Sequence, residues 1–344
     1  MSERKSVIAF GELLMRLSPK GFDRFVQADT FDVRYTGAEA NSAVSVVNYG
    51  MDAYAVSKVP DNEIGQACIN YLRRFGVNTD YIARGGERLG TFYLETGAAQ
   101  RASKIIYDRS HSAMRESNPD DYDWETICAG KHWFHFSGTA PALGENVRRV
   151  LEDGLKAAKK HRVMVSCDLN YRAKLWSPEE ANRVMTRLME HVDVLIGNEE
   201  DAEKVFGVKA EGSDVTKGAL VTESYKQVAA QLADKLGLKY VATTLRESIS
   251  ASANGWGGLL YDGKEHYLSR RYEINPIIDR VGGGDSFTGG LIYSMLSGWD
   301  SQRCVEFAVA ASCLKHSIVG DFNLASVEEV LALLGGDASG RVQR

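Results

Sequence analysis

Short apolar runs alternate with longer segments of helical period from about residue 131 onward, and this alternation limits the possible folds more than any other feature. Each run is too short for a helix, and each following segment repeats its apolar residues every three or four positions. Such alternation is typical of βαβ units around a parallel sheet. The expected strands are 133–136, 163–167, 192–196 and 240–244, and the expected helices are 145–161, 178–191 and 224–236.

Two stretches of the N-terminal third, residues 13–36 and 88–110, do not fit this pattern. They are rich in Arg, Tyr, Phe and Thr and alternate in part with period two, which predicts antiparallel strands. We expect these strands to form a small β-sheet lid. Elsewhere the patterns predict strands at 7–10, 54–59, 250–254 and 258–261, and helices at 41–49, 64–75, 286–296, 302–317 and 326–334.

The expected fold class is α/β, with a doubly wound, mostly parallel sheet flanked by helices and a small β-sheet lid. No linker separates the two halves of the chain, so residues 1–334 are expected to form a single domain into which the lid is inserted. Residues 335–344 contain several Gly and two Arg, and we expect them to be a disordered tail.

The composition favours an enzyme for small molecules. With 41 Lys and Arg against 46 Asp and Glu, the net charge of -5 offers no basic surface for nucleic acid. No apolar stretch reaches the roughly 18 residues of a membrane helix, so no membrane partner is expected. The 5 cysteines are scattered, without spacings suited to zinc, and indicate thiols in a reducing compartment. We therefore expect a cytoplasmic protein.

A glycine cluster at residues 282–284 is the sharpest local feature, because it ends at Asp285 directly before an apolar helical segment. Glycines allow the backbone to turn with its N–H groups outward, and a helix N-terminus adds partial positive charge. Together they predict a site for an anion such as a phosphate. Taken alone, the cluster is explained equally well as a loop with Asp285 at a helix N-terminus.

The cluster resembles the C-terminal signature D-x-x-G-A-G-D-x-F of the ribokinase-like, phosphofructokinase B type carbohydrate kinases. The matching residues are Asp279, Gly282, Gly284, Asp285 and Phe287, with Gly283 in place of Ala. The resemblance covers nearly the whole chain. Its other motifs are most similar to the 2-keto-3-deoxygluconate kinases of that family: G-A-E-A-N at 37–41, Tyr93, Y-x-R at Tyr107 and Arg109, and D-x-N-x-R at Asp168, Asn170 and Arg172.

The resemblance implies a catalytic group and a sugar site. Asp285 would be the general base for a primary hydroxyl, and the backbone of Gly282, Gly283 and Gly284 would form an anion hole. The implied sugar-binding residues are Gly37, Ala38, Asn41, Tyr93, Tyr107, Arg109, Arg172 and Asp321. The two arginines suit a carboxylate, because a guanidinium binds it through two hydrogen bonds. Structural explanations stay open: tyrosines on a sheet surface, Arg172 stacked on Trp176, and Asp321 in a turn.

The resemblance also implies an ATP site and Mg²⁺. Its implied ATP-binding residues are Asn170, Asn198, Thr244, Arg246, Gly282 and Gly284. The run from Asn198 to Asp201 is similar to the N-x-x-E motif that the family links to magnesium, so Glu200 and Asp201 are candidates to organise the ion through water. A charged first helical turn explains the same run. A monovalent cation near Asp279 and a homodimer formed through the lid are further expectations of the resemblance.

The expected function is an ATP-dependent kinase that phosphorylates the terminal primary hydroxyl of 2-keto-3-deoxygluconate or a close keto-deoxy sugar acid. Ribose-type members usually carry Asn or Asp where this chain has Leu13 and Leu14, which favours a different sugar. One alternative is a fructose-type or other neutral sugar kinase of the same family. Another is a non-catalytic, sugar-binding regulator on a kinase scaffold, which Asp285 and its glycines disfavour because binding alone needs no general base.

Overall fold

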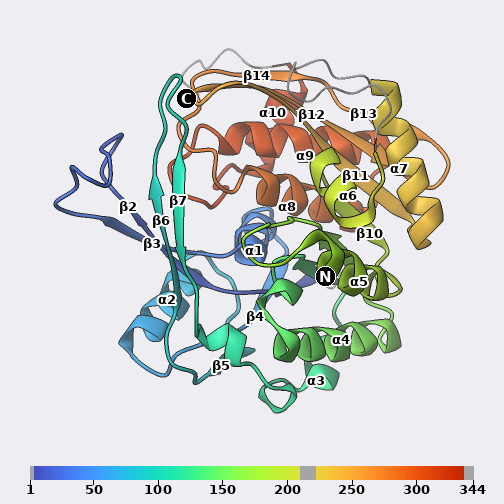
Figure 1. Ribbon diagram of the computed structural model, residues 1–344. Helices are drawn as coiled ribbons and strands as arrows, with labels where there is room; N and C mark the ends of the chain where they lie inside the picture. Colours follow the sequence, from blue (N-terminus) through green and yellow to red (C-terminus); the bar gives the residue numbers. More distant parts are fainter. Residues whose placement is uncertain (1–3, 210–221, 337–344) are drawn as a thin grey trace.

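A ten-stranded sheet with helices on both faces forms the body of the molecule (Figure 1). The computed structural model describes residues 4–209 and 222–336. The strand order is β13-β12-β11-β10-β9-β8-β1-β4-β5, with β14 paired to β12, and the strands from β11 to β5 in this order are parallel. The expected doubly wound α/β fold is confirmed. Most of the expected tail, residues 337–344, lies outside the described residues.

The bounds of the main-sheet strands are β1 Ser6–Phe10, β4 Asp52–Val59, β5 Ile82–Arg84, β8 Trp133–Ser137, β9 Met164–Asp168, β10 Val194–Gly197, β11 Tyr240–Ser250, β12 Ala253–Tyr261, β13 His266–Leu268 and β14 Tyr272–Ile274. The α-helices are α1 Ala38–Asn48, α2 Glu63–Arg74, α3 Trp124–Cys128, α4 Glu145–Lys160, α5 Pro178–Met189, α6 Glu199–Phe206, α7 Thr222–Leu236, α8 Gly283–Leu296, α9 Ser301–Lys315 and α10 Val327–Leu334.

Alternate residues of the buried strands supply two separate cores, one on each face of the sheet. In β1, Ile8 and Phe10 join the core under α3 to α7, whereas Val7 and Ala9 join the core under α1, α2, α8, α9 and α10. Successive side chains of a strand point to opposite faces, and a parallel sheet buries both. This explains why the strands appear in the sequence as continuous apolar runs.

Helix α8 lies unusually close to its neighbours because it carries glycines on both contact faces. A Cβ on Gly289 would lie 2.6 Å from the Cβ of Ser45 in α1, and a Cβ on Gly290 would lie 3.0 Å from the Cα of Ala308 in α9. The N-terminus of α8 is thereby held beside the N-terminal half of α1. This packing brings two regions together that are more than 240 residues apart in the sequence.

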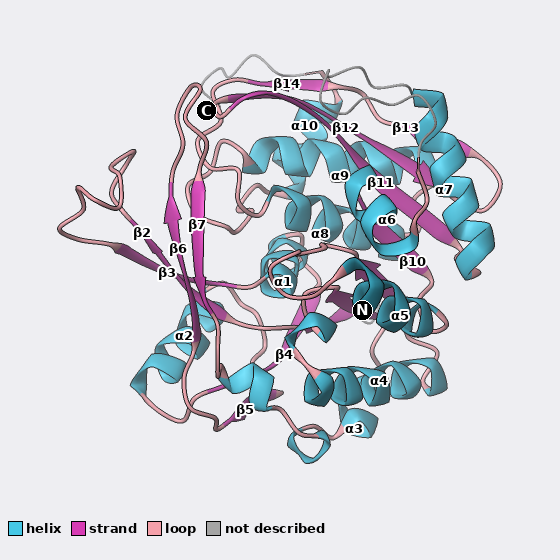
Figure 2. Cartoon of the chain, viewed as in Figure 1, coloured by secondary structure: helices cyan, strands magenta, loops and turns pink. Residues whose placement is uncertain are grey.

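The second sheet has the strand order β3-β2-β6-β7 and stands at one edge of the molecule (Figure 2). Its strands are β2 Leu14–Ser18, β3 Asp32–Thr36, β6 Gly90–Glu95 and β7 Lys104–Asp108, which fall within the two stretches that the sequence pattern singled out. The outer pairs β2–β3 and β6–β7 are antiparallel as expected, whereas the central pair β2–β6 is parallel. We call this sheet the lid. The tip of its β6–β7 hairpin reaches the β11–β12 turn, where Ala251 N donates to Ala99 O at 2.8 Å and Ala99 N donates to Ser252 Oγ at 3.0 Å.

Three expected elements differ from the structure. The strand expected at 250–254 is wrong, because β11 continues to Ser250 and the chain turns at residues 251 and 252, where Ser252 N donates to Ser250 Oγ. The helix expected from 41 begins at Ala38, and the helix expected from 286 begins at Gly283. In both cases the first helical turn contains two small residues and one acidic residue, whereas the apolar periodicity starts one turn later.

Within residues 4–209 and 222–336, no helix combines the length and the apolar character that crossing a lipid bilayer requires.

Candidate active site

A cavity of about 650 Å³ lies between the carboxyl ends of the parallel strands and the lid. Ligand sites of open α/β sheets are found at this edge. The cavity brings together every site residue expected from the sequence except Tyr93. These residues are Gly37, Ala38, Asn41, Tyr107, Arg109, Asn170, Arg172, Asn198, Glu200, Asp201, Thr244, Arg246, Gly282, Gly283, Gly284, Asp285 and Asp321.

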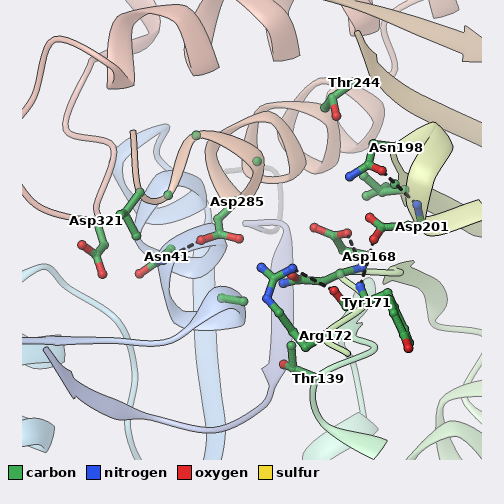
Figure 3. Close-up of a pocket in the computed structure, with 18 of the residues that line it drawn as sticks. Asn41, Thr139, Asp168, Tyr171, Arg172, Asn198, Asp201, Thr244, Asp285 and Asp321 are labelled. Carbon is green, nitrogen blue, oxygen red and sulfur yellow. Dashed lines mark hydrogen bonds between the residues drawn. The ribbon is translucent and has the colours of Figure 1, made fainter. Parts of the chain in front are cut away.

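Asp285 lies in the first turn of α8 and faces the cavity (Figure 3). Its Oδ2 accepts a 2.6 Å hydrogen bond from Asn41 Nδ2, and Asn41 Oδ1 accepts one of 2.8 Å from Thr36 Oγ1. Burial raises the pKa of Asp285 to about 7, with Glu39 and Asp321 acting in the same direction and Asn41 against them. A carboxyl group with a pKa near neutrality is suited to proton transfer. Asn41 therefore orients the carboxylate of Asp285.

The residues before Asp285, which we call the glycine loop (residues 279–284), lead into the N-terminus of α8, and Gly282, Gly283 and Gly284 line the cavity. Gly282 has a φ of +82°, and a Cβ there would overlap the carbonyl oxygen of Asp321. The carbonyl oxygens of the loop are used internally, since Gly282 O accepts from Ser286 Oγ at 2.7 Å and Gly283 O from Ser312 Oγ at 2.6 Å. The first helical turn leaves its N–H groups without helical partners, so the loop can bind an anion.

Arg16 joins the lid to the glycine loop and was not expected from the sequence. Its Nη2 donates to Asp279 Oδ2 at 2.8 Å, and its Nη1 contacts Asp321 Oδ1. All three side chains are buried. In β2, Leu14, Arg16 and Ser18 are buried and share one face of the strand, and Leu14 lines the cavity. Asp321 is therefore held by a lid arginine at the edge of the cavity.

The lid turns Phe92 and Tyr107 towards the cavity and Tyr93 away from it. Phe92 is the cross-strand partner of Tyr107, and directly opposed residues share a face of the sheet. Tyr93 belongs to the opposite face, where its ring lies 5.9 Å from that of Phe31. The expectation that Tyr93 and Tyr107 cover the same site is not met, because an odd separation along paired strands places them on different faces.

Arg109 already has an anionic partner. Its Nε donates to Glu12 Oε2 at 2.7 Å, and both side chains are buried. Ser112 Oγ contacts the other oxygen of Glu12. Glu12 also lines the cavity, and its position two residues after the end of β1 was the signal that could have identified it, since polar residues at the carboxyl ends of strands face the site. Arg109 thus reaches the cavity with its charge largely neutralised.

Arg172 extends into the cavity from the loop after β9 (Figure 3). Its Nη1 donates to Tyr171 O at 3.0 Å, and among the described residues it forms no ion pair. Burial raises the pKa values of Asp168, Asp201 and Asp285, and the charge of Arg172 opposes this rise at all three carboxyl groups, so the guanidinium lies near them. Trp176 is approached by Arg148 instead, at 5.8 Å, so the stacked role considered for Arg172 is not observed.

A group of carboxylates near Asn198 could hold a divalent cation. Asn198 caps α6 and accepts from Asp201 N at 2.9 Å, while Asp201 Oδ1 accepts from Tyr171 N at 3.1 Å. Burial raises the pKa of Asp201 to about 6, and burial with the nearby Asp201 and Asp285 raises that of Asp168 well above its usual range. Crowded carboxyl groups of this kind fit Mg²⁺, which prefers oxygen ligands and retains water. The exposed Glu200 lines the same wall.

Two arginines meet at the other end of the cavity. Arg280 Nη2 donates to Ser250 O at 3.1 Å and to Ala251 O at 2.8 Å, and burial together with the charge of Arg246 lowers its pKa. Arg246 is exposed and lines the cavity with Thr244. Two guanidinium groups that line the same part of the cavity suit a polyanion such as a polyphosphate. Arg280 was not expected from the sequence.

Comparisons with known proteins identify the family of this chain. The pfkB family carbohydrate kinases match the chain over residues 4–321. The 2-dehydro-3-deoxygalactonokinase of Haloferax volcanii is 31% identical over 333 residues, which cover 96% of this chain and 98% of that protein. The crystal structure of a 2-dehydro-3-deoxygluconokinase from Thermotoga maritima is 52% identical and matches with a TM-score of 0.93, covering 97% of this chain and 99% of that one.

A further crystal structure, of a pfkB family carbohydrate kinase from Listeria grayi, is 35% identical with a TM-score of 0.89 and covers 96% of this chain and 100% of that one. The family match spans both the main sheet and the lid. It confirms the family expected from the glycine cluster and the neighbouring motifs. The chain belongs to the pfkB family of carbohydrate kinases and is a sugar phosphotransferase.

Proposed function

We propose that the chain transfers the γ-phosphoryl group of ATP to the terminal primary hydroxyl of 2-keto-3-deoxygluconate or a close keto-deoxy sugar acid. The observation that carries this proposal is Asp285, whose carboxylate is oriented by Asn41 next to the N–H groups of the glycine loop. The names of the Thermotoga and Haloferax relatives support the substrate class. They differ in the sugar epimer, so both epimers belong to the proposal.

In this proposal Asp285 accepts the proton of the attacking hydroxyl, and the glycine loop binds the oxygens of the transferring phosphoryl group. Phosphoryl transfer depends mainly on positioning and on charge stabilisation, so a base that receives the proton late is sufficient. Arg246 and Thr244 would bind the phosphates of ATP. Mg²⁺, held through water near Asp201 and Glu200, would neutralise phosphate charge.

The cytoplasm is the proposed location, because ATP is available there. The 5 cysteines support it, since all are free thiols, as is usual in a reducing compartment.

The sugar carboxylate would be bound by Arg172 rather than by Arg109. Arg109 is paired with the buried Glu12, whereas Arg172 projects into the cavity without an ion pair among the described residues. Tyr107 and Phe92 would cover the sugar from the side of the lid. The sequence suggested that both arginines bind the sugar carboxylate, whereas this proposal assigns that role to Arg172 alone.

Replacing Arg172 by Lys is expected to raise the KM for the sugar acid about 10- to 100-fold and to change the KM for ATP little. An ammonium group cannot replace a guanidinium that binds a carboxylate through two hydrogen bonds, and such charged hydrogen bonds contribute about 1.5–3 kcal/mol. Steady-state kinetics with each substrate varied in turn measure the effect. The control is Arg183→Lys, an exposed position on α5. An unchanged KM for the sugar would indicate a neutral substrate.

A coupled assay of ADP release tests the function itself. The substrates to compare are 2-keto-3-deoxygluconate, 2-keto-3-deoxygalactonate, fructose and ribose. We expect kcat/KM to be at least about tenfold higher for one or both sugar acids than for the neutral sugars, because the neutral sugars lack the one charged contact. Preference for fructose would favour the neutral sugar kinase. Binding of a sugar acid without turnover would favour a regulator.

A homodimer formed through the lid is also part of the proposal. The outer face of the lid carries an apolar row of cross-strand neighbours, Val33, Leu17, Tyr93 and Ile106. Val33 is 51% exposed and Ile106 is 54% exposed. The edge strands β3 and β7 also keep unpaired backbone groups. A second copy related by a two-fold axis would bury this surface.

Replacing Ile106 by Glu is expected to convert the dimer to a monomer, because it places a charge in the centre of the proposed apolar interface. Light scattering coupled to size-exclusion chromatography measures the mass. Ile64→Glu on α2 is the matched control, since Ile64 is also exposed, at 46%, but does not belong to the lid. A wild-type protein that is monomeric at micromolar concentration, or a variant that stays dimeric, would contradict this interface.

A further inference from the structure

Lys315, the last residue of α9, is entirely buried although its side chain carries an ammonium group. Its Nζ donates to Asp279 O at 2.9 Å and to Ile318 O at 3.2 Å. Burying a lysine is costly unless its charge is paired and its donors are satisfied. Core packing alone therefore does not explain why an ammonium group lies behind the glycine loop.

The ammonium group is part of a clamp on the first residues of the glycine loop. The backbone N–H groups of Ile278 and Asp279 both donate to His316 O, at 2.8 and 3.3 Å. Asp279 Oδ1 accepts from Val281 N at 3.1 Å, and Asp279 Oδ2 accepts from Gly320 N at 3.0 Å. The carbonyl oxygen of Asp279 is held by Lys315. The end of α9 thus fixes the segment from which the anion hole is built.

Charge balance requires a second cation at this place. The carboxylates of Asp279 and Asp321 are both buried and share one guanidinium, that of Arg16. Two carboxylates and one guanidinium leave one uncompensated negative charge in a buried cluster, which is unfavourable. Lys315 supplies the missing positive charge. Burial lowers its pKa to about 8, whereas Asp279 and Asp321 act in the opposite direction, so it remains mainly protonated at pH 7.

We propose that Lys315 is a built-in cation that neutralises Asp279 and Asp321 and holds the glycine loop in its anion-binding conformation. Phosphoryl transfer by this protein then needs no free monovalent cation, and the ion that the family resemblance implies near Asp279 is replaced by the ammonium group of Lys315. Lys315 acts through the loop and not on the substrate, so it is a positioning residue. The kinetic part of this inference rests on the proposed kinase function.

The first experiment uses the wild-type protein. Kinase activity is measured in the chloride salts of K⁺, Na⁺, NH₄⁺ and tetramethylammonium at an ionic strength of about 0.1 M, so that screening is constant. We expect activities within about twofold of one another, well below one tenfold step of 1.4 kcal/mol. Activity that needs K⁺ or NH₄⁺ and is lost in tetramethylammonium would overturn the proposal, whatever the variants do.

The second experiment uses Lys315→Ala, which removes the ammonium group and leaves room for a small ion. Its kcat is expected to fall about 10- to 100-fold, with a smaller change in sugar KM, and NH₄⁺ or K⁺ is expected to restore about tenfold of the loss. The methionine of Lys315→Met fills the space, so NH₄⁺ or K⁺ should not restore the kcat of this variant. Lys235→Ala is the control, because Lys235 also lies at the end of a helix and donates to a carbonyl oxygen, Phe206 O, at 3.0 Å.

A readout without turnover separates this inference from the proposed function. NH₄⁺ or K⁺, compared with tetramethylammonium, should raise the Tm of Lys315→Ala and leave that of the wild type unchanged. If the wild type phosphorylates no sugar acid but the variant shows this selective stabilisation, only the proposed function fails. Two results would show that Lys315 does not act as the cation of the loop. One is a kcat of Lys315→Met equal to that of the wild type, and the other is a Lys315→Ala variant whose kcat and Tm do not respond to any small cation.

Discussion

Replacing Asp285 by Asn is expected to lower kcat by about 10²- to 10⁴-fold while the fold and the binding of sugar and nucleotide are retained. The amide has nearly the shape of the carboxylate, and its oxygen can still accept the hydrogen bond from Asn41. It cannot accept the proton of the attacking hydroxyl. Steady-state kinetics measure kcat, and calorimetric titration with the sugar acid measures binding.

The pH profile gives a second measure of the same assignment. The pKa of Asp285 is raised to about 7, so the carboxyl group gains its proton as the pH falls through neutrality and loses its function as a base. The kcat/KM of the wild type should therefore fall by about tenfold per pH unit below about 7, and the residual rate of the Asn variant should not follow this limb. Glu328→Gln, in the first turn of α10, is the control. Full activity of Asp285→Asn would exclude Asp285 as the base.

Replacing Gly282 by Ala is expected to lower kcat by about 10²- to 10³-fold, the effect of losing a donor from an anion hole. Two physical reasons act together. The φ of +82° is unfavourable for alanine, and its Cβ would overlap the carbonyl oxygen of Asp321, so the loop has to move. The displacement would turn backbone N–H groups away from the phosphoryl oxygens. Kinetics and thermal unfolding, measured together, check the result.

Gly298→Ala separates backbone strain from the loss of the anion hole. Gly298 lies just beyond the other end of α8 with a φ of +72°, and a Cβ there would have nothing within 4 Å. It should cost about 1 kcal/mol of stability and leave kcat nearly unchanged. If Gly282→Ala behaves like Gly298→Ala, the glycine loop does not bind the transferring group.

The main sheet could be predicted from the sequence because a parallel strand buried on both faces is a short continuous apolar run. Trp133–Ser137 and Met164–Asp168 are such strands, and the next α-helices along the chain, α4 and α5, show helical periodicity. The turn after Ser250 could not be predicted in the same way. Residues 250–254 are small and partly apolar, and only the pairing of β11 with β12 shows where the chain reverses.

The motif residues of the site could be predicted because each belongs to a short pattern with fixed spacing. The partners of these residues could not. Arg16 meets Asp279 across 263 positions, and Arg109 meets Glu12 across 97 positions, so no local pattern connects them. The face of Tyr93 depends on the register of β6 against β7, which the sequence leaves open. Lys315 looks like an ordinary basic residue in the last turn of a helix.

The contact between the β6–β7 hairpin and the β11–β12 turn attaches the lid to the main sheet at a second place. The strands of the lid are connected to the main sheet through the chain, and the hairpin tip binds the turn through the hydrogen bonds of Ala99. The carbonyl oxygens of that same turn are held by Arg280 of the glycine loop. We therefore expect a movement of the hairpin tip to disturb the contacts of Arg280 with the β11–β12 turn. A change in the length of the hairpin would then affect phosphate binding as well as sugar binding.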